Sequence, residues 1–172
     1  MNNTNENKTS DIYLAHVDFE TGRTQSFQEH TDNVTSYAKS ICPMGEIQKL
    51  VEAAALFHDA GKLSDDVQKD FQDILKKGDQ AHRNDLDHST AGGRMLWKMM
   101  RQKTAAELLS TVVYSHHGIS DCIDFESGCT LQERRAEKEC QEDIVKERFF
   151  QIFNFYHSEP SSFLYTQPVW TA

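Results

Sequence analysis

Five histidines and one aspartate stand at positions from which their side chains could converge on metal ions. They are His30, the pair His58-Asp59, His88 and the pair His116-His117. His30, His58 and His116 each lie four residues from an apolar residue of a predicted helix, so each extends a face that turns toward the core. Three predicted helices therefore direct an imidazole inward.

A shared metal site explains this set better than separate roles do. A buried imidazole must find partners for its ring nitrogens, and several imidazoles beside a carboxylate are best satisfied by a metal. Any one of them alone would more simply be a hydrogen-bonded core histidine or a surface residue. Asp59 offers two oxygens and could bridge two cations about 3.5 to 4 Å apart, an arrangement common in phosphoester cleavage.

Adjacent side chains on a helix diverge by about 100°, so the two members of each pair can share a site only near a helix end. Gly61 follows the first pair closely and Gly118 follows the second pair directly. We expect helix ends at both places.

The elements that must position these residues are mostly helical. Apolar residues recur at helical spacing in five stretches, residues 34–41, 47–57, 91–99, 108–113 and 131–156. Residues 66–87 predict a short helix followed by a loop, and residues 120–130 predict a loop. Residues 11–27, around the turn Glu20-Thr21-Gly22-Arg23, predict a small hairpin or an extended arm. The fold class expected is an all-α bundle with a minor extended N-terminal element.

Composition indicates a single domain. The chain has 172 residues, 38% of them apolar, and no apolar run approaches the roughly 18 residues that cross a bilayer. We expect a disordered N-terminus over residues 1–10, one domain over 11–157 and a tail over 158–172. The first ten residues resemble no targeting signal, so we expect a cytoplasmic protein with reduced cysteines and no membrane partner. The net charge of −9 disfavours non-specific adhesion to nucleic acid, but two divalent ions would return about four positive charges to the site.

Six short segments resemble a known family. His58-Asp59-Ala60-Gly61-Lys62 is similar to the H-D-x-G-K signature of the HD phosphohydrolase superfamily, and His30 matches its first ligand. The segments Tyr13–His16, Gly22-Arg23 and Gln28–Thr31 resemble the opening of the CRISPR-associated HD nuclease, the nuclease part of the type I helicase-nuclease. Asp87–Gly93 and Ser115–Gly118 resemble its H-S-x-x-G and S-H-H-G segments. The resemblance covers residues 11 to 124 and implies an HD-domain helical bundle.

The resemblance also implies the roles of individual residues. One metal would be held by His30, His58 and Asp59, and the other by Asp59, His88, His116 and His117. Asp59 and Lys62 would be the catalytic residues, with Lys62 as a phosphate or carboxylate partner; otherwise it is an exposed helix-end lysine. Ser89 would orient a ligand or touch the substrate, or else cap a helix. His16 matches a family position that is less clearly tied to the metals, and it is left out of the ligand set.

One family feature has no counterpart. The family places a further aspartate downstream, where it completes the first metal site, and no matching segment stands before Ala172. Asp121, Asp124 and Asp143 do not stand in a matching context. We therefore expect the first ion to be held more loosely than the second. No G-K-[ST] phosphate loop follows either, so the resemblance implies a helicase domain or subunit outside this chain.

The function implied is metal-dependent hydrolysis of DNA phosphodiester bonds, on single strands, in CRISPR type I antiviral defence alongside the surveillance complex. The cofactors expected are two divalent metal ions, drawn from Mn, Ni, Co, Fe or Mg. One alternative is a cyclic-dinucleotide phosphodiesterase of the HD type, disfavoured because no Gly-Tyr-Pro motif follows His116-His117. A mononucleotide phosphohydrolase would leave His88 and the His pair unexplained. A third is an inactive metal-binding interaction module.

Overall fold

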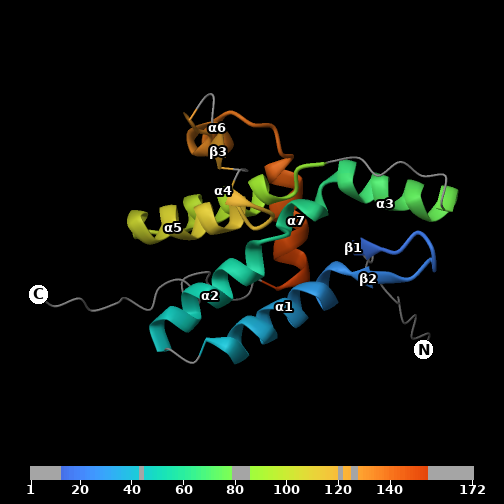
Figure 1. Ribbon diagram of the computed structural model, residues 1–172, viewed down its shortest axis with the longest axis horizontal. Helices are drawn as coiled ribbons and strands as arrows, with labels where there is room; N and C mark the ends of the chain where they lie inside the picture. The colour runs from blue at the N-terminus through green and yellow to red at the C-terminus, as the bar shows by residue number, and fades with distance from the viewer. Residues whose placement is uncertain (1–12, 43–44, 79–85, 120–121, 125–127, 155–172) are drawn as a thin grey trace, which may run out of the picture.

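The computed structural model describes residues 13–42, 45–78, 86–119, 122–124 and 128–154. Helices dominate it and surround the central helix α7 (Figure 1), which confirms the predicted all-α bundle. In chain order the elements are β1 (Leu14–Val17), β2 (Thr24–Ser26), α1 (Phe27–Ile41), α2 (Gly45–Phe57), the 3-10 helix η1 (Ala60–Leu63), α3 (Asp65–Lys77), α4 (Ser89–Met99), α5 (Lys103–Tyr114), β3 (Ile123–Asp124), β4 (Gly128–Cys129), α6 (Leu131–Ala136) and α7 (Glu142–Ile152).

The predicted hairpin is present at the N-terminal side of the bundle. β1 and β2 pair antiparallel, and Gly22 takes a positive φ of 67° in the turn between them. The side chain of Asp18 accepts hydrogen bonds from the backbone of Glu20 and Thr21, which closes this turn. α1 then begins at once, because Ser26 Oγ caps it by accepting from the Glu29 amide at 3.1 Å.

Helix α7 packs against the elements that carry or flank the first expected ligands. Phe149 is completely buried, and its ring stacks on Phe57 of α2 at a centroid distance of 4.7 Å. It also meets Phe27 of α1 edge to face at 6.4 Å. Arg148, one residue before, donates to the Leu63 carbonyl of η1 at 2.6 Å. One turn of α7 thus contacts α1, which carries His30, and the two elements α2 and η1 that flank His58 and Asp59.

The predicted apolar stripes are only partly buried. Ala54 and Phe57 of α2 and Met95 and Leu96 of α4 are in the core as expected. Several others, however, are substantially exposed: Tyr37, Ile41, Ile47, Leu108 and Val112. Helical period alone predicted that these residues face the core, which was wrong. Helix α1 turns Phe27, Thr31 and Ala38 inward, and of these only Ala38 belongs to the predicted stripe.

Two further predictions needed correction. Residues 131–156 were predicted as one helical stretch, but α6 and α7 are separate helices. Gln141, between them, has a positive φ of 48°, which a continuing α-helix does not allow. Residues 120–130 were predicted as a loop, yet they contain the short antiparallel pair β3 and β4.

The helix predicted after residue 66 is confirmed as α3, and it buries Val67, Phe71 and Ile74 against Leu14. The predictions for residues 1–10 and 158–172 lie outside the described residues. Within the described ranges, no helix is long and apolar enough to cross a membrane.

Candidate metal centre

Asp59 lies at the centre of the site, in the turn between α2 and η1. Its side chain is buried, with 4% of its surface exposed. The backbone at this point touches the start of α4 directly, because the Gly61 amide donates to the His88 carbonyl at 3.0 Å. A Cβ on Gly61 would lie 2.3 Å from that oxygen, so only glycine permits this approach. The close contact brings His88 to the same carboxylate as His58.

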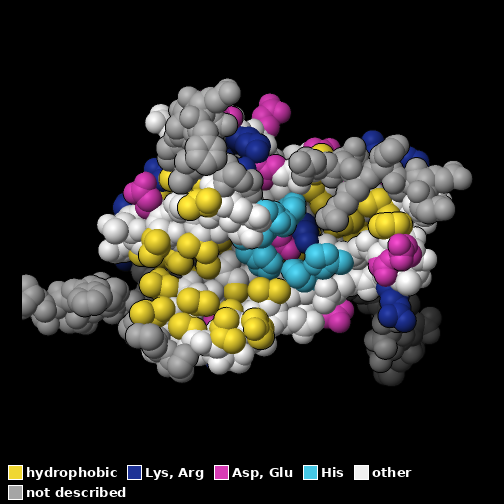
Figure 2. All heavy atoms as spheres, viewed as in Figure 1, with side chains coloured by type: hydrophobic (Ala, Val, Ile, Leu, Met, Phe, Trp, Pro, Cys, Tyr) yellow, Lys and Arg dark blue, Asp and Glu magenta, His cyan; other side chains and the backbone are white. Residues whose placement is uncertain are grey.

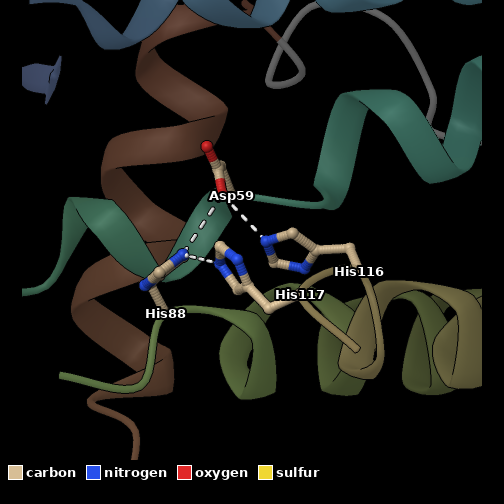
Figure 3. A group of neighbouring side chains, drawn as sticks. All are labelled: Asp59, His88, His116 and His117. Atoms are coloured by element: carbon tan, nitrogen blue, oxygen red, sulfur yellow. Dashed lines mark hydrogen bonds and ion pairs between the residues drawn. The ribbon is translucent and has the colours of Figure 1, made fainter. Parts of the chain in front are cut away.

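The two oxygens of Asp59 divide the surrounding histidines into two groups. Oδ2 lies 3.0 Å from His30 Nε2 and 3.2 Å from His58 Nε2. Oδ1 lies 3.2 Å from His116 Nε2 and 3.5 Å from His88 Nε2. Figure 3 shows His88, His116 and His117 pointing toward Asp59 from one side. This division matches the two ligand sets that the resemblance implied.

Hydrogen bonds of the Nδ1 atoms, which face away from Asp59, fix the tautomer of three of these histidines. Nδ1 of His58, His88 and His116 donates to a backbone carbonyl, of Ala55 at 2.6 Å, Leu86 at 3.1 Å and Val113 at 2.7 Å respectively. A carbonyl can only accept, so these Nδ1 atoms carry the hydrogen. Nε2 of each neutral ring therefore directs its lone pair at the carboxylate, as in metal sites where the second ring nitrogen is hydrogen-bonded.

Without a cation this arrangement is electrostatically unfavourable. Neutral rings would aim their lone pairs at carboxylate oxygens, whereas protonated rings would gather four positive charges beside Lys62. His116 Nε2 is buried and makes no well-aligned hydrogen bond within the described part of the chain. His117 Nε2 lies 2.6 Å from His88 Nε2. Donors bound to one ion at about 2.0 to 2.2 Å lie about 3 to 3.5 Å apart, close to the spacings around Asp59, so the residues fit a divalent metal.

The pKa shifts of Asp59, His88 and His116 come from burial and from the close approach of these groups to one another. Burial alone would raise the pKa of Asp59, but the imidazoles of His116, His30 and His58 hold it far below its ordinary value. Burial lowers the pKa of His116, and Asp59 more than compensates, so that pKa is raised. For His88, burial outweighs the attraction of Asp59 and its pKa is lowered. Asp59 is thus a carboxylate throughout the physiological pH range.

Among the residues that the structure describes, two sets of side chains have donor atoms close enough to hold an ion. One set is Asp59, His88, His116 and His117, the complete second ligand set expected from the sequence. The other contains His30 and Asp59 together with His16, which the sequence analysis left out. His58 lies beside the set of His16, His30 and Asp59, since its Nε2 is 3.3 Å from His30 Nε2. All six expected ligands are therefore gathered at one place.

Lys62 is not an exposed helix-end lysine. Its side chain is 5% exposed, and Nζ lies 2.8 Å from Asp59 Oδ2. The short turn of η1 places it three residues after the carboxylate, on the same side. Its geometry is that of a carboxylate partner.

Ser89 lies away from the carboxylate, in a second network. Its buried hydroxyl contacts Asp87 Oδ1 at 3.3 Å and accepts from Arg134 at 2.9 Å. The capping side chain of α4 is Asp87, whose Oδ1 accepts from the amides of Ser89 and Thr90 at 2.9 and 3.0 Å. The interpretation of Ser89 as the cap was therefore wrong, and its contacts favour a positioning role for His88.

The position of His116 corrects one step of the sequence argument. That argument placed His116 on an inward face of α5 shared with Leu108 and Val112, both of which are exposed. α5 ends at Tyr114, and the following turn, closed by a hydrogen bond from the Gly118 amide to the Ser115 carbonyl, carries His116 back toward Asp59. His116 therefore reaches Asp59 through this turn and not through an inward face of α5.

The structure adds residues that the sequence analysis did not assign. Asp87 and Arg134 hold the start of α4, and Gln25 Oε1 lies 3.3 Å from His30 Nδ1. An aspartate two residues before the first residue of a predicted helix is a capping signal that could have identified Asp87. Of the three aspartates considered downstream, Asp143 is exposed in the first turn of α7. Asp121 and the side chain of Asp124 lie outside what the structure describes.

Comparison with known protein families decides the identity of the chain. The family described as Cas3, HD domain matches residues 22–166. The chain belongs to this family. The Cas3 HD match covers every expected metal ligand and extends past the region of the sequence resemblance to include α6 and α7. It supports a metal-dependent HD hydrolase in a CRISPR context. Comparisons with curated proteins and with solved structures gave no significant match.

Proposed function

We propose that this Cas3 HD domain is a two-metal nuclease that hydrolyses phosphodiester bonds of single-stranded DNA. One observation carries the proposal. The two oxygens of Asp59 face two separate histidine sets, His30 and His58 on one side and His88 and His116 on the other. A carboxylate placed in this way can serve two cations at once.

The protein's own groups have distinct tasks in this reaction. A pair of divalent ions, when bound, acidifies water near neutral pH and neutralises phosphodiester oxygens. Asp59 joins the two halves, and Lys62 balances its charge on the Oδ2 side. The backbone carbonyls behind His58, His88 and His116 hold these rings in the tautomer that presents Nε2. The imidazole-rich donor set favours Mn, Fe, Co or Ni over Mg.

The location of the site supports a strand as substrate. Figure 2 shows the histidines gathered together at the surface, beside a broad group of apolar side chains. His117 is the most exposed of the four residues in the second set. Among the described residues of the site, the polar side chains of the histidines and Lys62 are turned toward Asp59 and not toward where bases would lie. We therefore expect cleavage with weak sequence preference, with single strands bending into the site more readily than a stiff duplex.

Partners follow from the family. We propose that the domain acts beside the CRISPR surveillance complex, on strands separated by a helicase domain or subunit. The chain's negative charge of −9 fits this division of labour, because strong non-specific adhesion to DNA is not expected of the domain alone.

The test compares three substrates with purified protein reloaded with Mn²⁺ or Ni²⁺. Labelled single-stranded DNA, the same sequence as a duplex, and a cyclic dinucleotide are followed by gel and chromatography. Faster cleavage of the single strand supports the proposal, and Asp59→Ala serves as the inactive control. Faster cleavage of the duplex contradicts it. Turnover of only the cyclic dinucleotide identifies a phosphodiesterase, and metal binding without any turnover identifies an interaction module.

A further inference from the structure

The hairpin β1–β2 reaches the metal centre through an irregular strand. Leu14 pairs with Ser26 and His16 pairs with Gln25, so the register shifts at Ala15. Leu14 and Ala15 are consecutive and both buried, which a regular strand would not allow, whereas His16 is exposed. A bulge of this kind re-aims a side chain and is frequent beside active sites.

The bulge places His16 against His30. Their rings meet edge to face with centroids 4.5 Å apart. One donor atom each of His16, His30 and Asp59 lies within 4.8 Å of the other two. Donors on opposite sides of one ion, bound at about 2.0 to 2.2 Å, are separated by about 4.0 to 4.4 Å. His16 is thus at or near the reach of an ion held by the other two.

The same hairpin also orients His30. Gln25, the cross-strand partner of His16, presents Oε1 3.3 Å from His30 Nδ1. A hydrogen bond to this oxygen keeps the hydrogen on Nδ1 and leaves Nε2 free to bind. Gln25 therefore fixes the tautomer of His30, as backbone carbonyls do for His58, His88 and His116.

The hairpin is held firmly against the rest of the site. Gln68 of α3 accepts from the Leu14 amide at 3.0 Å and donates to the Leu14 carbonyl at 2.8 Å. The side-chain amide of Gln68 also donates to the Lys62 carbonyl of η1 at 2.7 Å. One side chain thus ties β1 to the segment that follows Asp59, and His16 does not depend on a loose strand.

We infer that His16 is a ligand of the first metal ion, with Gln25 as a positioning residue. This inference rests on the proposed two-metal function. The first site then has four protein ligands, His16, His30, His58 and Asp59, as many as the second. The sequence predicted a loosely held first ion because it counted only three. With His16 included, the two ions are held with affinities within about tenfold of each other.

The experiment is a calorimetric titration of metal-free protein with Mn²⁺, with bound metal counted independently. The unmodified chain takes up two ions of similar affinity. His16→Ala weakens one event by more than about tenfold and leaves the other unchanged, and Gln25→Ala weakens the same event by about tenfold. Thr24→Ala, an exposed position on the same hairpin, is the matched control and changes neither. In the His30→Ala background, adding His16→Ala has no further effect.

Two additional variants keep the test decisive if His16→Ala perturbs folding. His16→Leu keeps the bulk without a donor and reproduces the loss, whereas His16→Asp supplies a carboxylate and retains binding. Two ions in the unmodified chain, with neither event altered by His16→Ala or His16→Leu, overturn the assignment of His16 alone. A first event already about a hundredfold weaker in the unmodified chain also overturns it. A chain that binds one ion or none overturns the two-metal proposal and the assignment together.

Discussion

Replacement of Asp59 separates the metal centre from the fold. Asp59→Asn keeps the size of the side chain but removes its charge and one of its two accepting oxygens. The ammonium of Lys62, 5% exposed and 2.8 Å from Oδ2, then loses its anionic partner. Asp59→Ala removes the group entirely.

The magnitude follows from burial. Leaving one partner of a buried ion pair uncompensated costs about 3 to 5 kcal/mol. A domain of this size is stable by about 5 to 15 kcal/mol, so the variants remain folded and keep nearly all their helical content. Both ions lose a shared ligand, and we expect each affinity to fall more than a hundredfold, about 2.7 kcal/mol per ion. Cleavage is abolished.

Two assays check this prediction together. Urea unfolding in the presence of a chelator measures the stability cost without metal, and Mn²⁺ titration measures the binding cost. Adding Lys62→Met to Asp59→Asn removes the unpaired charge and restores a large part of the lost stability, but no activity. Unimpaired cleavage by Asp59→Ala would refute the bridging carboxylate. A loss of only one binding event would show that Asp59 serves a single ion.

Three further predictions concern other parts of the structure. His30→Ala removes one Mn²⁺ binding event and spares the other, whereas His116→Ala does the reverse; loss of both events in either variant would contradict separate sites. Burial would raise the pKa of Asp87, but Lys138 and Thr90 hold it below its ordinary value of about 3.9. The stability advantage over Asp87→Asn is therefore complete above about pH 5 and shrinks as the pH falls, and urea midpoints that stay equally far apart at pH 3 would argue against it. Phe149→Ala lowers the free energy of unfolding by about 3 to 5 kcal/mol, because its buried ring fills the space between Phe57 and Phe27, and a cost below 1 kcal/mol would exclude that role.

The histidines and the aspartate that meet at the site could be selected from the sequence because they stand in short motifs. His58 and Asp59 are neighbours in sequence, and the turn between α2 and η1 keeps them together in space. The helical class was equally accessible from the period of the apolar residues. The face of each helix that turns inward was harder to predict from the sequence. Helix α1, for example, buries Thr31 and exposes Tyr37. That choice is made by tertiary packing and not by period.

His16 shows what the sequence could not provide. Its distance from His30 depends on a bulge at Ala15 and on Gln68, which lies 54 residues from Leu14 along the chain. Neither the bulge nor the pairing of Gln25 with His16 has a signature in a short strand. The network of Asp87 with Arg134 is likewise non-local, spanning 47 residues. Such supporting contacts become visible only with the fold.

The order of the elements along the chain determines when the site can form during synthesis. All the proposed ligands, from His16 to His117, precede α7, whereas Phe149 and Arg148 of α7 contact α1, α2 and η1, which carry or flank the ligands of the first site. A nascent chain that has left the ribosome only as far as His117 has every donor but lacks the helix on which α1, α2 and η1 are assembled. Ordered metal uptake therefore waits until translation has passed α7.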